Sequence, residues 1–181
     1  MSEVWIRGNN ALTTVSLPGL VQVWKNFQVD NHPALTSIVA SNLTTVGAGT
    51  GPSSTTGHLN VSGNALLASA SFPVLATLDG HLWASTTGLI NLNGFSALRS
   101  PVYQVIVTAN PALTDISGLS GIGATFANPA VVNGFSIQNN TSLCTDHVAS
   151  LIAAIQARGA GAFANPPVNS GNKSCSAQQE N

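Results

Sequence analysis

The chain has 181 residues, a length that suits one compact domain or one short repeat array. Hydrophobic residues make up 44% of it, enough for a sizeable core, but charged residues make up only 6%, far below the ~25% of ordinary soluble domains. A net charge of −1 with five Lys and Arg residues excludes the basic surface that nucleic-acid binding needs, and no apolar run is long enough to cross a bilayer. We therefore expect a surface of Ser, Thr, Asn, Gln and Gly, which is more common in secreted and cell-surface proteins than in cytosolic enzymes.

Residues 1–3 lead directly into a predicted strand, and no secretory signal precedes it. A polar cap of the kind that normally begins a repeat array is also missing. We interpret the chain as a piece of a longer exported precursor, or as an exported protein without its leader. An uncapped first repeat would also allow association through the N-terminal end.

One phrase recurs six times between residues 4 and 143, and each copy centres on an inward-facing apolar anchor. The anchors are Leu12, Leu35, Leu67, Ile90, Leu113 and Leu143. The intervals are 23, 32, 23, 23 and 30 residues, and the longer ones hold the Gly-rich inserts 48–57 and 123–133. In the fourth copy Leu89 is the alternative anchor, and a strand shifted by one residue would exchange its two faces.

Two further features recur in each copy. Apolar residues stand eight and six positions before the anchor, as Val105 and Val107 do, and this two-residue period predicts a short strand with one buried face. Three positions before the anchor a polar residue predicts a structural ladder that satisfies buried turn backbone. The ladder residues are Asn9, His32, Asn64, Thr87, Asn110 and Asn140.

The C-terminal part differs from the repeats. Thr145 is a plausible N-cap of a helix that ends near Arg158, and its apolar face should lie across the last repeat. Cys144 and Cys175 flank this segment, and a disulfide between them would stabilise the fold by roughly 3–4 kcal/mol and imply an oxidising compartment. Two free buried thiols are the alternative, and metal binding by two cysteines is less favoured. We expect repeats over 1–143, a helical cap over 144–175 and a flexible tail over 176–181.

The recurring phrase strand–N–P–A–L–T resembles the receptor L-domain family, most closely its microbial exported and cell-wall members. Segments 110–114, 32–36, 42–47 and 72–75 carry this phrase. The resemblance implies a mainly β fold, a right-handed, leucine-rich-repeat-like β-solenoid of about six rungs with a C-terminal capping helix. It also implies a non-enzymatic domain that binds a ligand or a protein. The chain departs from ordinary leucine-rich repeats by placing the second leucine three positions after the asparagine.

Outward positions on the predicted strands form one continuous face that we expect to bind a partner. Its residues are Trp5, Arg7, Gln28, Asp30, Asn60, Ser62, Trp83, Ser85, Ile106 and Thr108. Large apolar side chains on an open face indicate an interaction surface. The alternative is that the inserts 48–57 or 123–133 cover them. Arg7 and Asp30 are neighbours on this face, and a simple ion pair is sufficient to explain them.

His58 and His81 precede adjacent strands and are weak candidates for a metal site, because no third ligand accompanies them. A structural role for both is favoured, and we expect no metal and no cofactor. The six acidic residues fall on different faces of the repeat, which argues against a general acid–base pair.

The function predicted from these features is a non-enzymatic extracellular or cell-surface adhesion module that contacts a protein or a glycan. It should not bind nucleic acid or insert into membranes. Alternatives are a structural cell-wall protein without a specific ligand, a binder of ice or of a polysaccharide lattice, and, least favoured, a β-helix carbohydrate-active enzyme. Asn60 lies in a glycosylation sequon, and a glycan there would obstruct the predicted face.

Overall fold

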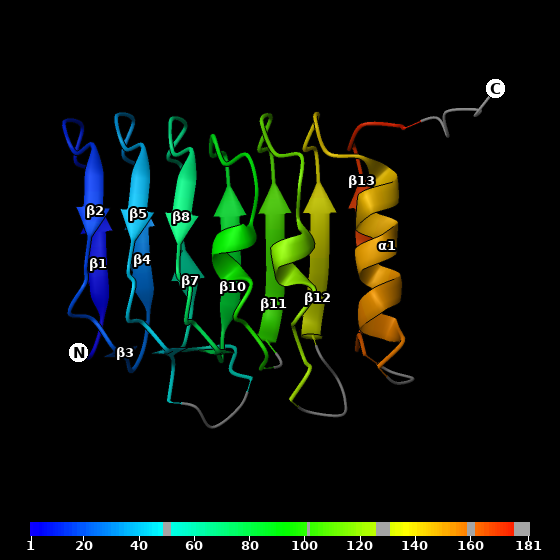
Figure 1. Cartoon of the computed structure of the whole chain (residues 1–181), viewed down its shortest axis with the longest axis horizontal. Coiled ribbons are helices and arrows are strands. Elements are labelled where there is room, and N and C mark those ends of the chain that lie inside the picture. The colour runs from blue at the N-terminus through cyan, green and yellow to red at the C-terminus, as the bar shows by residue number, and fades with distance from the viewer. Residues whose placement is uncertain (49–51, 101, 126–130, 159–161, 176–181) are drawn as a thin grey trace.

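The computed structural model describes residues 1–48, 52–100, 102–125, 131–158 and 162–175. These residues form three parallel sheets and one α-helix, and the strands lie side by side along the long axis of the molecule, with the N-terminus at one end and the helix near the other (Figure 1). Within the described ranges, no helix has the length and apolar character needed to span a membrane.

The largest sheet has seven strands, and each pairs in parallel with the next. Its strands in spatial order are β1 (Val4–Arg7), β4 (Phe27–Asp30), β7 (Leu59–Asn60), β10 (His81–Ser85), β11 (Val102–Thr108), β12 (Val131–Gln138) and β13 (Val168–Ser170). The register sets equivalent positions of successive repeats opposite each other, so Leu59, Leu82 and Val105 are adjacent and fully buried. One face of this sheet therefore forms a wall of the core.

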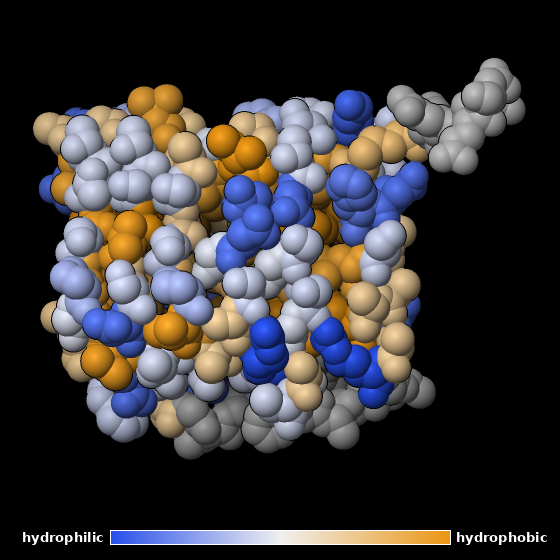
Figure 2. Space-filling view, viewed as in Figure 1, coloured by the Kyte–Doolittle hydropathy of each residue, from blue (hydrophilic) through white to orange (hydrophobic). Residues whose placement is uncertain are grey.

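Two smaller sheets have three strands each. The first contains β2 (Thr14–Ser16), β5 (Ser37–Val39) and β8 (Ser69–Ser71), and the second contains β3 (Gln22–Val23), β6 (Thr45–Val46) and β9 (Thr77–Leu78). In Figure 1 β2, β5 and β8 lie in front of the large sheet. Seen from the same side, this surface is covered mainly by weakly polar residues with hydrophobic ones between them (Figure 2), as expected for a chain with so few charges.

Two 3-10 helices continue this front layer beyond β8. They are η1 (Asn93–Phe95) and η2 (Ser117–Leu119), in the fourth and fifth repeats. Each contains a glycine packed against the backbone of the preceding repeat: a Cβ on Gly94 would collide with the carbonyl of Ala70, and one on Gly118 with the carbonyl of Leu92. The small front sheet ends at β8 because these turns replace the next strands.

The predicted fold class, a right-handed β-solenoid with about six rungs, is wrong. The structure has parallel sheets of seven, three and three strands and a single helix. Exclusively parallel pairing is the pairing typical of α/β proteins. The recurring anchors indicated one uniform repeat. In the structure, however, the front layer changes from strands to 3-10 helices after β8, and a seventh strand of the large sheet follows the α-helix.

The inward side chains of the three sheets form a continuous apolar core. Phe27 and Phe72 make an edge-to-face contact with ring centroids 5.5 Å apart, and Phe72 stacks on Phe95 at 5.3 Å. These three rings come from successive repeats and are at most 1% exposed. Aromatic pairs of this geometry add to the stabilisation that burial provides.

The anchor predicted for the fourth repeat is corrected by the structure. Ile90 is 51% exposed, whereas Leu89 is 1% exposed and occupies the core position. The strand itself is not shifted, since Leu82 and Ala84 still face inward and pair with Val105 and Val107. The turn between this strand and its anchor is therefore one residue shorter than in the other repeats.

The ladder residues connect each turn to the next. The backbone N–H groups of Asn110 and Thr87 donate to the side-chain oxygens of Asn140 and Asn110, at 3.0 and 2.9 Å. In the opposite direction, the Asn110 amide donates to the carbonyl of Ala84 at 2.9 Å. Asn110 and Asn140 are fully buried, so these bonds satisfy backbone groups that water cannot reach.

His32 takes the same place in the ladder with an imidazole instead of an amide. Its Nδ1 accepts the N–H of Asn9 at 2.9 Å, and its Nε2 lies 3.0 Å from the carbonyl of Ile6. This network assigns the proton of the fully buried ring to Nε2. The ring thus combines one acceptor and one donor, as an asparagine side chain does.

The C-terminal segment begins with α1 (Thr145–Gln156) and continues into β13, the seventh strand of the large sheet. Cys144, and not Thr145, is the N-cap residue, and Val148, Leu151 and Ile155 are buried. The guanidinium of Arg158 donates to the carbonyls of Ser120 and Ile122. A disulfide joins Cys144 to Cys175, as predicted. The predicted tail, 176–181, lies outside the described residues.

Candidate functional site

One row of outward side chains crosses the whole seven-stranded sheet. The register places Trp5 beside Gln28, Gln28 beside Asn60, and Asn60 beside Trp83. The row continues through the half-buried Ile106. Trp5 is 57% exposed and Trp83 is 43% exposed, so both indoles remain accessible to a partner.

A second row lies two positions further along the same strands. It begins with Arg7 beside Asp30 and continues through Ser62, Ser85 and Thr108, which are half-buried. Of the ten residues predicted to form the binding face, Asp30 is the one that the structure buries, with an exposed fraction of 4%. We call the other nine the tryptophan face: Trp5, Arg7, Gln28, Asn60, Ser62, Trp83, Ser85, Ile106 and Thr108.

Both exposed indoles of the tryptophan face are held by the side chain two residues later on the same strand. The Trp83 indole N–H donates to the Ser85 hydroxyl at 2.9 Å. The Arg7 guanidinium lies 5.2 Å from the centroid of the Trp5 ring. Because these contacts restrict the rotation of each ring, binding would require little further ordering of either side chain.

Asp30 is buried because it fixes the charged residue of the tryptophan face. The Nε of Arg7 donates to Oδ1 of Asp30 at 2.8 Å, and Asn31 donates to Oδ2 at the same distance. A carboxylate with these partners tolerates burial, which the strand alternation alone did not reveal. The pair also neutralises Arg7, so the tryptophan face carries no uncompensated charge among its nine residues.

Two amides lie between the two indoles. Oδ1 of Asn60 accepts the N–H of Ser62 at 2.9 Å. Within the described part of the chain, the side-chain amide of Gln28 makes no hydrogen bond, and neither does Nδ2 of Asn60. These groups can therefore donate to a ligand without breaking an internal bond.

The far end of the same sheet is different. The hydroxyl of Ser136 donates to Oε1 of Gln138 at 2.8 Å, and Nε2 of Gln138 donates to Ser170 at 2.7 Å. These polar side chains already satisfy each other. The section of the face with unused hydrogen-bonding groups and exposed aromatic rings thus extends from β1 to β10.

His58 and His81 are the weak metal candidates: His58 lies just before β7, and His81 is the first residue of β10. Nδ1 of His58 accepts the backbone N–H of His81 at 3.1 Å, and the two rings meet edge to face at 4.3 Å. Burial, assisted by the neighbouring His81, lowers the pKa of His58 to about 4. No group of three metal-ligating side chains occurs in the portion of the chain that the structure describes. The arrangement is that of a neutral, hydrogen-bonded pair.

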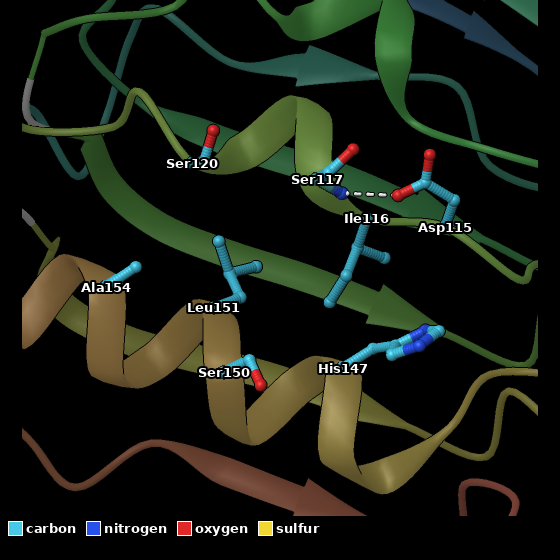
Figure 3. A pocket seen from close by; sticks show the side chains of 8 residues that line it. All are labelled: Asp115, Ile116, Ser117, Ser120, His147, Ser150, Leu151 and Ala154. Atoms are coloured by element: carbon cyan, nitrogen blue, oxygen red, sulfur yellow. Dashed lines mark hydrogen bonds between the residues drawn. The ribbon is translucent and has the colours of Figure 1, made fainter.

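A separate groove of about 380 Å³ lies between η2 and α1 (Figure 3). Ile116 and Leu151 give it an apolar floor, and Asp115 and His147 face it from one end. Serine hydroxyls complete the lining, and the residues are Asp115, Ile116, Ser117, Ser120, His147, Ser150, Leu151 and Ala154. Sequence reasoning missed this groove because its walls come from a repeat and from the helix, and no local motif marks it.

The groove holds an acid, an imidazole and hydroxyls, but they are not linked for nucleophilic catalysis. Asp115 accepts the N–H of Ser117 at 2.8 Å, and Nδ1 of His147 lies 3.4 Å from the carbonyl of Thr114. Partial burial raises the pKa of Asp115, but hydrogen bonds from Ser117 and Asn93 and the charge of His147 together hold it below its ordinary value. Among the residues that line the groove, no serine is hydrogen-bonded to His147.

The N-terminal end has accessible edges and apolar groups. In the described chain β1, β2 and β3 each have a neighbouring strand on one side only. Leu17 and Leu20 are partly buried there, and Val21 and Trp24 are more than half exposed beside a groove of about 700 Å³. Association through this end stays a prediction.

No family model, curated protein or solved structure matches the chain. The resemblance to receptor L domains therefore stays a prediction.

Proposed function

We propose that the chain is a non-catalytic binding module that works outside the cell and holds its partner against the tryptophan face. The observation that carries the proposal is the pair of exposed indoles, Trp5 and Trp83, on one register row of a single sheet. Contact between an apolar indole and water is unfavourable in the free protein. Exposed tryptophans are enriched at surfaces where partners bind.

The chemistry of the surrounding face supports recognition of a protein or a glycan at a cell surface. Amide and hydroxyl groups surround the two rings, and Arg7 is neutralised by Asp30. A face of this kind attracts neither a phosphate backbone nor an anionic membrane, since both require exposed positive charge. It suits an uncharged or mixed polar surface that buries the indoles.

Two features of the whole chain support action outside the cell. The Cys144–Cys175 disulfide is a bond that persists in oxidising compartments. The low charge content, 6%, agrees with a surface built from neutral polar residues. Binding of the added chain to the outer surface of intact living cells would test the extracellular assignment.

The test is a binding screen with the intact chain, made in a host that does not glycosylate, against a glycan array and an array of cell-surface proteins. The double variant Trp5→Ala/Trp83→Ala should lose at least tenfold in affinity for the true partner, about 1.4 kcal/mol. Trp24→Ala is the matched control, because Trp24 is 53% exposed but lies outside the tryptophan face.

The melting temperatures of all variants must stay close to that of the parent chain, since both face tryptophans are exposed. A partner that binds the double variant as tightly as the parent would contradict the proposal. A large loss of stability in Trp83→Ala would also contradict it, because the ring would then belong to the core.

A further inference from the structure

We infer that the partner of the tryptophan face is a neutral linear glycan, laid across the strands so that its sugar rings contact Trp5 and Trp83. This inference depends on the proposed function and assigns its ligand class. The two indoles are three strands apart in one register row, a separation of about 14 Å. The spacing between neighbouring strands is close to the length of one sugar ring in an extended chain.

The faces of the two indoles suit sugar rings. One face of a pyranose ring exposes C–H groups, which pack well on an aromatic surface, while its hydroxyls point outward around the edge. Trp5 receives the Arg7 guanidinium on one side and is still 57% exposed, and Trp83 uses only its N–H, on the ring edge, to contact Ser85. Each ring therefore retains an accessible surface in a fixed orientation.

The groups between the indoles suit hydroxyls. Gln28 and Asn60 occupy the two intervening strands, and in the described structure their NH₂ groups are not used internally. A sugar hydroxyl both donates and accepts, so an amide side chain can bind it with either atom. The order aromatic, amide, amide, aromatic thus places two hydrogen-bonding positions between two stacking positions along a line across the sheet.

Charge favours a neutral glycan over an acidic one. The Arg7 guanidinium is already paired with Asp30 at 2.8 Å. His58 directly precedes β7, and its pKa of about 4 leaves it uncharged at neutral pH. The pKa of His81 is also lowered, because burial outweighs its hydrogen bonds to Gln104 and Ser54. A uronic acid or sulfated chain would find no free cation on this face.

The shape of the accessible region favours a chain over a broad protein surface. Side chains with free hydrogen-bonding groups lie between β1 and β10. Beyond Ile106, the polar side chains of Ser136, Gln138 and Ser170 are hydrogen-bonded to one another. A protein partner would need roughly 800 Å² on each side, over which hot-spot residues usually cluster centrally. Two indoles with two amide-bearing strands between them form a narrow strip instead.

The experiment is isothermal titration calorimetry of the intact, unglycosylated chain with neutral linear oligomers of glucose, mannose, xylose and N-acetylglucosamine of increasing length. At least one series should bind, and its affinity should rise with length until the oligomer spans Trp5 to Trp83 and then level off. Trp5→Ala and Trp83→Ala should each weaken binding by about tenfold or more. Trp24→Ala should leave the affinity unchanged.

Two further variants distinguish the contribution of aromatic stacking to affinity from effects on folding and from the contribution of hydrogen bonds. Trp83→Phe keeps an aromatic face without the N–H to Ser85, and it should retain more affinity than Trp83→Ala at the same thermal stability. Gln28→Ala should lose a few-fold in affinity. Acidic oligomers of equal length should bind no more tightly than neutral ones at low salt.

The outcomes distinguish this inference from the proposed function. If no neutral oligomer binds, but a protein partner is found whose binding depends on Trp5 and Trp83, the glycan inference is overturned and the proposed function stands. If oligomers bind equally well to the Trp5→Ala/Trp83→Ala variant, both are overturned. Affinity that does not depend on oligomer length also contradicts a ligand lying across the strands.

Discussion

His58 is a titratable residue that the fold keeps neutral. Its Nδ1 accepts the His81 N–H, and the two imidazoles are 4.3 Å apart. Burial and the neighbouring ring lower its pKa from 6.5 to about 4. The unfolded chain therefore takes up a proton between these two pH values that the folded chain does not, and protonation favours unfolding there.

We expect the free energy of unfolding to rise with pH between about 4 and 6.5 and to level off above that window. His58→Asn should reduce this slope, because an asparagine oxygen can still accept the His81 N–H, as Asn26 already does for His58 at 3.1 Å. The measurement is urea unfolding at several pH values. The lowered pKa of Asp115 affects stability mainly below this window, so an unchanged slope in the variant would contradict the assignment.

At the scale of elements, the turn after β10 decides which apolar side chain enters the core. Leu89 is 1% exposed and Ile90 is 51% exposed, although they are adjacent and similar in size. Leu89→Ala should lower the free energy of unfolding by about 2–5 kcal/mol through lost burial and a cavity. Ile90→Ala should change it by no more than about 0.5 kcal/mol. Denaturant unfolding of both variants checks this, and equal effects would mean that the turn is wrongly assigned.

The strands could be predicted from the sequence where a position has the same structural role in every repeat. Inward apolar pairs such as Val105 and Val107, and ladder residues such as Asn110, recur because each repeat has the same backbone to bury and to satisfy. The choice between Leu89 and Ile90 could not be made, because both are apolar and the shorter turn has no sequence marker. The fold class was missed for a related reason: anchor spacing does not show that η1 and η2 replace strands.

Strand β13 lies outside the repeat count because it has no leucine anchor. A signal for it was nevertheless present, since the pair Gly171–Asn172 repeats the pairs Gly8–Asn9 and Gly63–Asn64. In all three pairs the glycine has a positive φ, and the side chain of Asn172 accepts the N–H of Asn140 at 2.9 Å. The tryptophan face could be predicted as outward positions, but the burial of Asp30 and the fixing of the indoles depend on side-chain contacts between strands.

At the scale of the whole molecule, the disulfide connects the start of α1 to the residues after β13. Replacing both cysteines by serine should lower the free energy of unfolding by roughly 3–4 kcal/mol, because the unfolded chain gains the freedom of a closed loop. Calorimetry or denaturant unfolding measures this. Binding at the tryptophan face should not change, since Trp5 and Trp83 lie on strands distant from the bridge along the sheet order. A loss of binding in the cysteine variant would contradict this independence.

The parallel register also determines how such a molecule can vary in size. An interval of 23 residues moves the chain by one strand of the large sheet, as from Val4 to Phe27 or from Leu82 to Val105. Duplication or deletion of one such unit would change the width of the sheet across its strands by about 4.8 Å. Because equivalent positions of successive repeats carry similar side chains, the remaining residues would keep similar neighbours. Tandem gene duplication would thus lengthen the molecule in fixed increments while the packing of the hydrophobic core is repeated.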